Sequence, residues 1–256
     1  MFQRAIVRLP SKNFAMGMTT AELGKPKYDR ALNQHELYCS ALEHCGLTLV
    51  RLDADERCPD SAFVEDTALL TERCAILARP GAVSRAGEVS VIAEVLERFY
   101  SEIHSIHAPG TLDGGDVCEA DNHFYIGISR RTNEAGARQL AAFLASVGYT
   151  SSFVDIRSQT EILHLKSGLA YLCDNRMVVI DALANYKAFR DFDLIRVDSG
   201  EEYAANCVRV NGVVLVAAGF SAFEKRLVKL GYQTIAVEMS EFQKMDGGLS
   251  CLSLRL

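Results

Sequence analysis

Short apolar runs interrupted by a polar turn recur along the chain. Strand-length apolar segments on both sides of turn-favouring residues are typical of a β-hairpin. Four such hairpins are predicted, at residues 62–79, 115–128, 169–180 and 204–218. The last has the strongest signal, because its Asn211-Gly212 turn tolerates the positive φ angles that a two-residue hairpin turn requires.

A helix-like stretch follows each hairpin, with apolar residues three and four positions apart. These stretches are residues 84–100, 132–147, 185–192 and 221–230, and a fifth lies at 28–45. The stretch 185–192 is short and its pattern is weak. One more strand is expected after each helix, at residues 47–52, 103–107, 152–156, 194–197 and 234–237.

Five helices and five such strands require a fifth hairpin. It forms if the C-terminal residues 248–256 pair with residues 2–9, which closes the array into a ring. A closed ring leaves no sheet edge exposed. The predicted fold is therefore α/β, a ring of five pseudo-symmetric ββαβ-like units in one domain, residues 1–256. An ordinary doubly wound α/β fold is the alternative, but it leaves the hairpin before every helix unexplained.

Composition narrows the class of function. The chain has 256 residues with 27 Lys or Arg and 33 Asp or Glu, a formal net charge of −6. Lys and Arg form no cluster, so we expect no nucleic-acid partner, which would need a basic face. The longest wholly apolar stretch, residues 213–218, is far shorter than the ~20 residues of a membrane-spanning helix, so no membrane partner is expected.

The eight cysteines include no Cys-x-x-Cys pair, and a chain of this length needs no disulfides for stability. We interpret them as thiols and expect a cytoplasmic protein, since the N-terminal residues also lack the apolar core of a secretory signal. No metal and no other cofactor is expected, because the short ligand spacing of a zinc site is missing. If zinc binds, we expect inhibition.

Reactive side chains fall at comparable places in the repeat. The first strands of the hairpins are expected to carry Glu65, Asp66, Asp113, His164 and Cys251. Equivalent positions of a pseudo-rotational ring converge on its axis, so these groups should be neighbours. A thiolate is a nucleophile that a nearby base activates, and His164 is the base at hand. Asp113 can hold the imidazole in the useful tautomer.

Two acids, Glu65 and Asp66, are then left beside the nucleophile, where they would attract a cation such as a guanidinium or amidinium. The alternative is that they only pair with basic neighbours, because ion pairs are commoner than catalytic acids. A lone cysteine is usually a small buried apolar residue, and we give seven of the eight that interpretation, Cys251 excepted. Asp116 is interpreted as structural, and the five histidines other than His164 as core or surface residues.

Five motifs in order resemble those of the dimethylarginine dimethylaminohydrolases, a branch of the guanidino-group modifying enzymes. They are Phe63-Val64-Glu65-Asp66, Thr111-Leu112-Asp113-Gly114-Gly115-Asp116, Arg131-Thr132-Asn133, Leu163-His164-Leu165-Lys166 and Asp246-Gly247-Gly248-Leu249-Ser250-Cys251. The resemblance runs from end to end of the chain. It implies the five-bladed α/β propeller, or pentein fold, which agrees with the ring indicated by the turns and helices.

The resemblance also implies roles by position. Cys251 corresponds to the nucleophile, His164 to the acid/base and Asp113 to the carboxylate that orients it. The implied substrate-binding residues are Asp60, Glu65 and Asp66 around the guanidinium, Arg85 and Arg131 at the α-carboxylate, and the backbone carbonyls of Met18 and Met245 at the ammonium group. A guanidinium fork suits a carboxylate well. Met18 lies in the implied mobile lid, residues 14–25, and stands where a leucine is expected.

Lys166 separates two branches of the superfamily. The arginine deiminases carry a His-x-Asp motif. In this sequence, which resembles that motif at His164-Leu165, the position of the aspartate is taken by Lys166. One acid fewer suits a dimethylated nitrogen, which has no N–H bonds, so dimethylarginine is favoured over arginine. The resemblance therefore implies hydrolysis of asymmetric dimethylarginine or monomethylarginine to citrulline and dimethylamine or methylamine, through a covalent adduct on Cys251.

Two alternatives stay open. One is an arginine deiminase or another guanidino or amidino hydrolase on the same ring. The other, from a different class, is a non-catalytic pentein that binds a macromolecular partner, although such a module would not need Cys, His and acid together. The expected partner is a small cationic amino acid, and a homodimer is left open.

Overall fold

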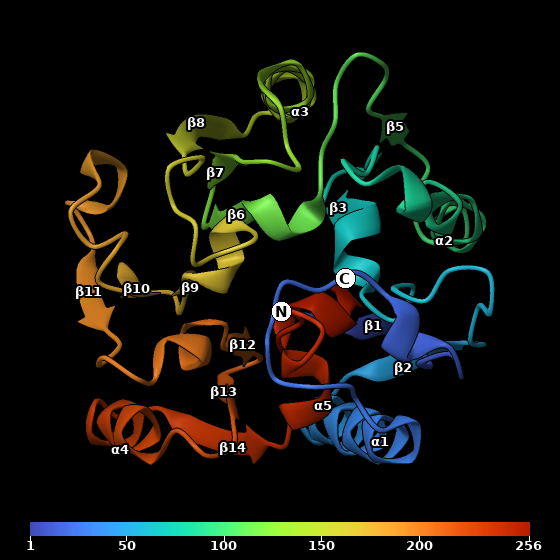
Figure 1. Cartoon of the computed structure of the whole chain (residues 1–256). Coiled ribbons are helices and arrows are strands. Elements are labelled where there is room, and N and C mark those ends of the chain that lie inside the picture. Colours follow the sequence, from blue (N-terminus) through green and yellow to red (C-terminus); the bar gives the residue numbers. More distant parts are fainter.

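Fifteen strands form five sheets of three strands, arranged around a common centre in the computed structural model, which describes residues 1–256 (Figure 1). In chain order the sheets are β15 (Leu254–Arg255), β1 (Arg4–Arg8) and β2 (Thr48–Leu52); β3 (Ala68–Leu70), β4 (Ala75–Leu77) and β5 (Ile103–Ser105); β6 (Val117–Ala120), β7 (His123–Ile128) and β8 (Thr150–Asp155); β9 (Leu169–Tyr171), β10 (Arg176–Val179) and β11 (Asp193–Arg196); β12 (Val208–Val210), β13 (Val213–Ala217) and β14 (Gln233–Val237).

All five sheets have the same topology. The middle strand is antiparallel to its hairpin partner and parallel to the third strand. The hairpin β12–β13 turns at Asn211 and Gly212, with φ angles of 48° and 97°, as the sequence predicted. In the first sheet β1 pairs with β15, with Ala5 opposite Arg255 and Ile6 opposite Leu254. The predicted closure of the ring by the two ends of the chain is thus confirmed.

Helices connect the middle strand to its parallel neighbour in four of the five units, because parallel strands need a long crossover. They lie outside the ring of sheets (Figure 1) and are α1 (Tyr28–His44), α2 (Glu88–Leu96), α3 (Glu134–Ser146) and α4 (Ser221–Lys229). The side chain of Asn133 caps α3 by accepting the N–H of Gly136, and α4 is followed by Gly231 with φ of 93°. Both termini were expected from these capping signals.

The predicted helix at residues 185–192 is wrong. That connection contains only a 3₁₀ turn, Lys187–Phe189, whose Phe189 is fully buried. A segment this short cannot offset the cost of nucleating an α-helix, so packing of its aromatic side chain decides its conformation. The stretch 84–100 is also divided, into the 3₁₀ turn Val83–Arg85 and the shorter helix α2.

The segments expected as the first strands of the hairpins are 3₁₀ helices that lead into those strands. They are η2 (Val64–Thr67), η4 (Gly114–Asp116), η5 (Leu165–Ser167), η7 (Glu202–Ala205) and η8 (Ser250–Leu252). They contact one another at the ring's centre, where no strand is alongside to pair with. Space is tight there: a Cβ on Gly114 would lie 2.0 Å from the carbonyl oxygen of Glu65, so only glycine fits.

A short helix that the sequence did not predict, α5 (Ser240–Gln243), supports the last of these segments. Its Phe242 packs edge-on against Phe14 and Phe63, with ring centroids 5.4 and 6.2 Å away. The buried apolar clusters lie between neighbouring sheets and under the helices. The ring's core is therefore peripheral, and its centre is free for polar side chains. No helix is long and apolar enough to cross a membrane.

Candidate active site

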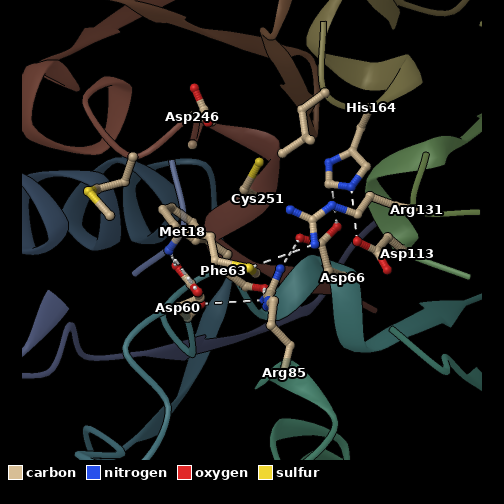
Figure 2. A pocket seen from close by; sticks show the side chains of 13 residues that line it. Met18, Asp60, Phe63, Asp66, Arg85, Asp113, Arg131, His164, Asp246 and Cys251 are labelled. Atoms are coloured by element: carbon tan, nitrogen blue, oxygen red, sulfur yellow. Dashed lines mark hydrogen bonds and ion pairs between the residues drawn. The ribbon is translucent and has the colours of Figure 1, made fainter. Parts of the chain in front are cut away.

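A pocket at the ring's centre is lined by every predicted site residue except Glu65 (Figure 2). Its lining residues are Met18, Asp60, Phe63, Asp66, Arg85, Asp113, Arg131, Leu163, His164, Met245, Asp246, Gly247 and Cys251. These residues lie between positions 18 and 164 and between positions 245 and 251, and the ring brings them together.

His164 begins η5 and is buried between two carboxylates. Its Nε2 lies 3.0 Å from Oδ2 of Asp113, and its Nδ1 lies 4.0 Å from Oδ1 of Asp66. Burial lowers the pKa of His164, but the negative charges of Asp66, Asp116 and Asp113 outweigh burial and raise it to about 9. The imidazole is therefore protonated at neutral pH. Asp113 is itself held by the backbone N–H of Gly81, at 2.8 Å.

Cys251 lies in η8, and its thiol and the imidazole of His164 both point into the pocket (Figure 2). The backbone N–H of Gly248 donates to its Sγ at 3.4 Å. Burial and the negative charges of Glu65 and Asp66 raise the pKa of this thiol to about 12, against the opposing effects of that N–H and of Lys166. At neutral pH the thiol of Cys251 is therefore protonated.

Asp66 is the acid that faces the pocket. It is 3% exposed and accepts hydrogen bonds from the backbone N–H of Gly115 at 2.9 Å and from Nη1 of Arg85 at 2.5 Å. Burial alone raises the pKa of Asp66, but the positive charges of His164 and Arg85 lower it to about 2. A permanently ionised carboxylate is thus held beside the thiol, where a cation can meet it.

The two predicted arginines lie in different environments. Arg85 is buried and its donors are already engaged, by Asp66, by Glu88 and by the backbone carbonyl of Phe63. It lines the pocket but is arranged to hold Asp66. Arg131 forms no ion pair, and the nearest polar contact of its guanidinium is Sδ of Met18, at 4.0 Å. Of the two, Arg131 has a guanidinium free to bind an anion.

Glu65 does not face the pocket, although its neighbour Asp66 does. Its carboxylate lies behind the cysteine segment, 2.6 Å from Nζ of Lys166 and 2.7 Å from Oγ of Ser250, with Arg255 at 3.6 Å. Adjacent residues of a 3₁₀ turn point in different directions, so one acid faces in and the other away. Lys166 therefore stands where another acid would add a negative charge, and its ammonium group also neutralises the charge of Glu65.

The lid segment closes over the pocket. The backbone N–H of Met18 donates to both carboxylate oxygens of Asp60, at 3.2 Å. Thr20 donates to Oδ2 of Asp246 from its backbone N–H at 2.5 Å and from its hydroxyl at 3.0 Å. The cavity beneath has a volume of about 30 Å³, far below the several hundred Å³ of typical ligand pockets. With the lid in this position the cavity is too small to hold an amino acid.

Asp246 was missed by sequence reasoning as a site residue in its own right. Its φ of 57° is in the left-handed region, which Asp and Asn tolerate better than other non-glycine residues. The Asp-Gly-Gly run was the only signal in the sequence. Asp116, interpreted as structural, does not line the pocket; it accepts from the N–H of Leu165 and from the hydroxyl of Ser129.

Asp66, Asp113 and His164 place one ligand atom each within 4.8 Å of one another, which is close enough for a metal ion. All three are already bound to protein groups: His164 to Asp113, Asp113 also to Gly81, and Asp66 to Arg85 and Gly115. Each carboxylate oxygen of the two acids therefore already has one donor from the protein, and the cluster is held together without a metal ion.

Known proteins match the whole chain. Residues 58–210, more than half of it, match the model of the arginine deiminase family. The N(G),N(G)-dimethylarginine dimethylaminohydrolase of Pseudomonas aeruginosa is 45% identical over 100% of both chains, and that of Streptomyces coelicolor is 34% identical over 99% of this chain and 97% of its own length.

Solved structures agree. A cysteine-to-serine variant of the Pseudomonas aeruginosa enzyme complexed with citrulline superposes with a TM-score of 0.97, at 45% identity and full coverage of both chains. The N-terminal domain of ArgZ, a cyanobacterial arginine dihydrolase, gives a TM-score of 0.88 over 100% of this chain and 97% of its own, but at 17% identity it shows the fold alone. The five-bladed pentein fold is thus confirmed, and the chain belongs to the dimethylarginine dimethylaminohydrolase family.

Proposed function

We propose that this protein hydrolyses asymmetric dimethylarginine and monomethylarginine to citrulline and dimethylamine or methylamine, without a cofactor. One observation carries the proposal: a cysteine thiol, an imidazolium with its orienting acid and an ionised carboxylate share one closable pocket in a chain of this family. The relative solved with citrulline supports the nature of the product. The eight free thiols support an intracellular setting.

The charges of the pocket suit the two ends of an amino acid that carries a guanidinium. We place the guanidinium against Asp66, beside Cys251, because that carboxylate is ionised and aimed into the pocket. Arg131 is free to meet the α-carboxylate. The backbone carbonyls of Met18 and Met245, with Asp60, are left for the ammonium group, since all three residues line the pocket and Met18 and Asp60 lie together on one side of it (Figure 2).

Binding of the substrate itself favours the reactive thiolate. A guanidinium beside Cys251 offsets the negative charges that help to keep the thiol protonated, so the thiol releases its proton to solvent water when the cation binds. The thiolate then attacks the guanidinium carbon. The protonated His164 donates its proton to the departing methylamine, which leaves a thiouronium-type adduct.

The second half of the reaction uses the same groups. His164, now neutral, takes a proton from water as that water attacks the adduct carbon. Collapse of the intermediate breaks the C–S bond and releases citrulline, and the hydroxyl proton passes to the sulfur, which restores the thiol of Cys251. Asp113 holds the imidazole in one orientation through both proton transfers, as its 3.0 Å contact allows.

Lys166 supports a methylated substrate over arginine. By binding Glu65 it leaves Asp66 as the acid for the guanidinium, so fewer acceptors await N–H donors. A dimethylated nitrogen has no N–H, and an unmet acceptor would disfavour it. Arginine deiminase activity is the second candidate, favoured by the match to that family's model.

One assay separates the two candidates. The protein is incubated with asymmetric dimethylarginine, monomethylarginine, arginine and agmatine, and citrulline, dimethylamine, methylamine and ammonia are measured. Dimethylamine from dimethylarginine with little ammonia from arginine is expected. Ammonia from arginine as the main product would replace the proposal by a deiminase. Cys251→Ser should abolish turnover and leave the thermal melting temperature unchanged, because a hydroxyl has no accessible anion at neutral pH.

A further inference from the structure

Asn206 follows η7 and is buried beside the segment that carries Cys251. Every hydrogen-bonding group of its side-chain amide has a partner. Its Oδ1 accepts from the backbone N–H of Ser250 at 2.9 Å, and its Nδ2 donates to the backbone carbonyl of Lys166 at 2.9 Å and to Oγ of Ser250 at 3.1 Å. One amide thus links the cysteine segment to the segment that begins at His164.

These contacts belong to a closed circuit of hydrogen bonds, which we call the axial network: Asn206, Ser250, Glu65 and Lys166. The hydroxyl of Ser250 donates to Oε2 of Glu65 at 2.7 Å, and Nζ of Lys166 donates to its Oε1 at 2.6 Å. The four residues come from four units of the ring, and none lines the pocket. The network therefore affects the site only through the segments that carry Cys251 and His164, without contact with the pocket itself.

Asn206 also packs against the backbone of Gly248. A Cβ at Gly248 would lie 2.5 Å from Cγ and Oδ1 of Asn206, so the two groups are in close contact and only glycine fits. The N–H of Gly248 is the one that donates to Sγ of Cys251. Asn206 thus holds both Gly248 and Ser250 and leaves the turn between them little freedom.

We infer that Asn206 is a positioning residue for Cys251: it holds the turn 248–250 so that the N–H of Gly248 faces the sulfur as the thiolate forms. A backbone N–H aimed at the sulfur stabilises the anion. This inference rests on the proposed role of Cys251 as nucleophile.

The charged groups around the thiol define what the turn must counter. They are Glu65 and Asp66 from η2, Lys166 from η5 and His164 across the pocket. The phenol of Tyr203, which is neutral, also lies nearby and donates to the carbonyl of Gly247 at 2.8 Å. The acids oppose ionisation of the thiol, so loss of one aligned N–H matters more here than at an open surface.

The test compares two asparagines of the same chemistry. In Asn206→Asp the acceptor for a backbone N–H stays and both donors are lost. Asn211→Asp is the matched control, because Asn211 also accepts one backbone N–H, from Phe2, and donates to two carbonyls, of Phe2 and Cys45, far from the pocket. Asn206→Ala removes both donors and also the acceptor of the Ser250 N–H, and it adds no charge.

The measured quantity is the rate at which 2-chloroacetamidine alkylates Cys251, between about pH 6 and pH 9, where the rate follows the thiolate fraction. Both Asn206 variants should react about tenfold more slowly than wild type across this range. With dimethylarginine, kcat should fall about 10- to 100-fold while KM changes less than about threefold, since Asn206 does not touch the pocket.

The inference is overturned if both Asn206 variants behave as Asn211→Asp does, with a lower melting temperature but unchanged alkylation. It is also overturned if only Asn206→Asp slows alkylation, because added charge would then explain the effect. Should neither variant fold, Ser250→Ala removes one hydroxyl of the network and must slow alkylation as well. Alkylation needs no turnover, so failure of wild type to hydrolyse any methylarginine would refute the proposed function and leave this test intact.

Discussion

His164 has a raised pKa because three acids face it, and the consequence can be measured directly. We expect its imidazole to titrate near pH 9. Asp113→Asn should lower that midpoint by about one to two units, since a hydrogen bond to a charged group is worth about 1.5–3 kcal/mol. The measurement is an NMR titration of labelled histidine, with the His164 signal assigned by its loss in His164→Gly.

The same shift has a definite sign for stability. The folded-state pKa of His164 lies above its ordinary value of 6.5, so the stabilisation by its charged form is complete below pH 6.5 and is lost as the pH rises through about 9. In the titration of Asp113→Asn, His123 is the control, because its hydrogen-bond partners are the hydroxyls of Thr150 and Ser152 and no acid. A His164 midpoint that stays in place in Asp113→Asn would contradict the assigned contact.

The two arginines of the pocket should differ in what they recognise. Arg131→Ala should lower kcat/KM for dimethylarginine about 10- to 100-fold and barely change the already low value for agmatine, which has the guanidinium but no α-carboxylate. Arg85→Ala should lower both, because Arg85 holds Asp66 at the guanidinium end. Steady-state kinetics with both compounds decide the matter. Equal losses in Arg131→Ala would withdraw its assignment to the carboxylate.

Among the elements, the lid is held over the pocket by a few hydrogen bonds to distant parts of the chain, made by Met18, Thr19 and Thr20. Its tip is held to the cysteine segment mainly through Thr20 and Asp246, and Thr20 is exposed. Thr20→Val removes one hydrogen bond to a carboxylate without touching the pocket. We expect KM for dimethylarginine to rise about 3- to 10-fold with little change in kcat, because the closed state binds substrate and is less populated.

A matched lid variant isolates the contact. Glu22 is exposed in the same segment and makes no hydrogen bond, so Glu22→Gln should leave KM unchanged. If Thr20→Val and Glu22→Gln give the same KM, closure of the lid does not depend on Asp246.

At the scale of elements, the sequence pattern located most helices and the parallel strands, but it misassigned the axial 3₁₀ segments and the 185–192 connection. The pattern of apolar residues indicates which positions are buried. It does not indicate whether a neighbouring strand is present for a buried segment to pair with.

For the whole molecule, closure of the ring is a testable source of stability. Deleting residues 254–256 removes β15 and its pairing with β1, including the hydrogen bonds that join Arg4 to Leu256. It also removes the buried side chain of Leu254 and so exposes the apolar surface that packs against it. The free energy of unfolding should fall by about 3–5 kcal/mol. Urea unfolding followed by circular dichroism measures it, and Leu256→Ala, which keeps the backbone pairing, is the control.

The same experiment tests the prediction of one domain. Wild type should unfold in a single transition, with loss of activity coincident with loss of secondary structure, because every unit of the ring supplies a residue to the axis. Two separated transitions would contradict a single cooperative domain. A truncated protein as stable as Leu256→Ala would show that the ring does not depend on its closing strand.

By itself the sequence determined the repeat, the order of strand and helix within it and the closing of the ring by the two ends of the chain, because these follow from local periodicity and turn chemistry. It also identified Cys251, His164, Asp113 and Asp66 as a set, through their equivalent places in the repeat. Nine of the ten predicted residues line the pocket, and the roles assigned to them remain proposals.

Only the tertiary structure decided how those side chains are paired. It turned Glu65 toward Lys166 and away from the pocket, set Arg85 against Asp66 and placed Asn206 behind the cysteine segment. The physical reason is competition: buried charges and amides take the partners that lie closest in space, and at the axis those partners come from other units of the ring. The sequence pattern of one unit therefore does not predict which partners the other four units supply to its side chains.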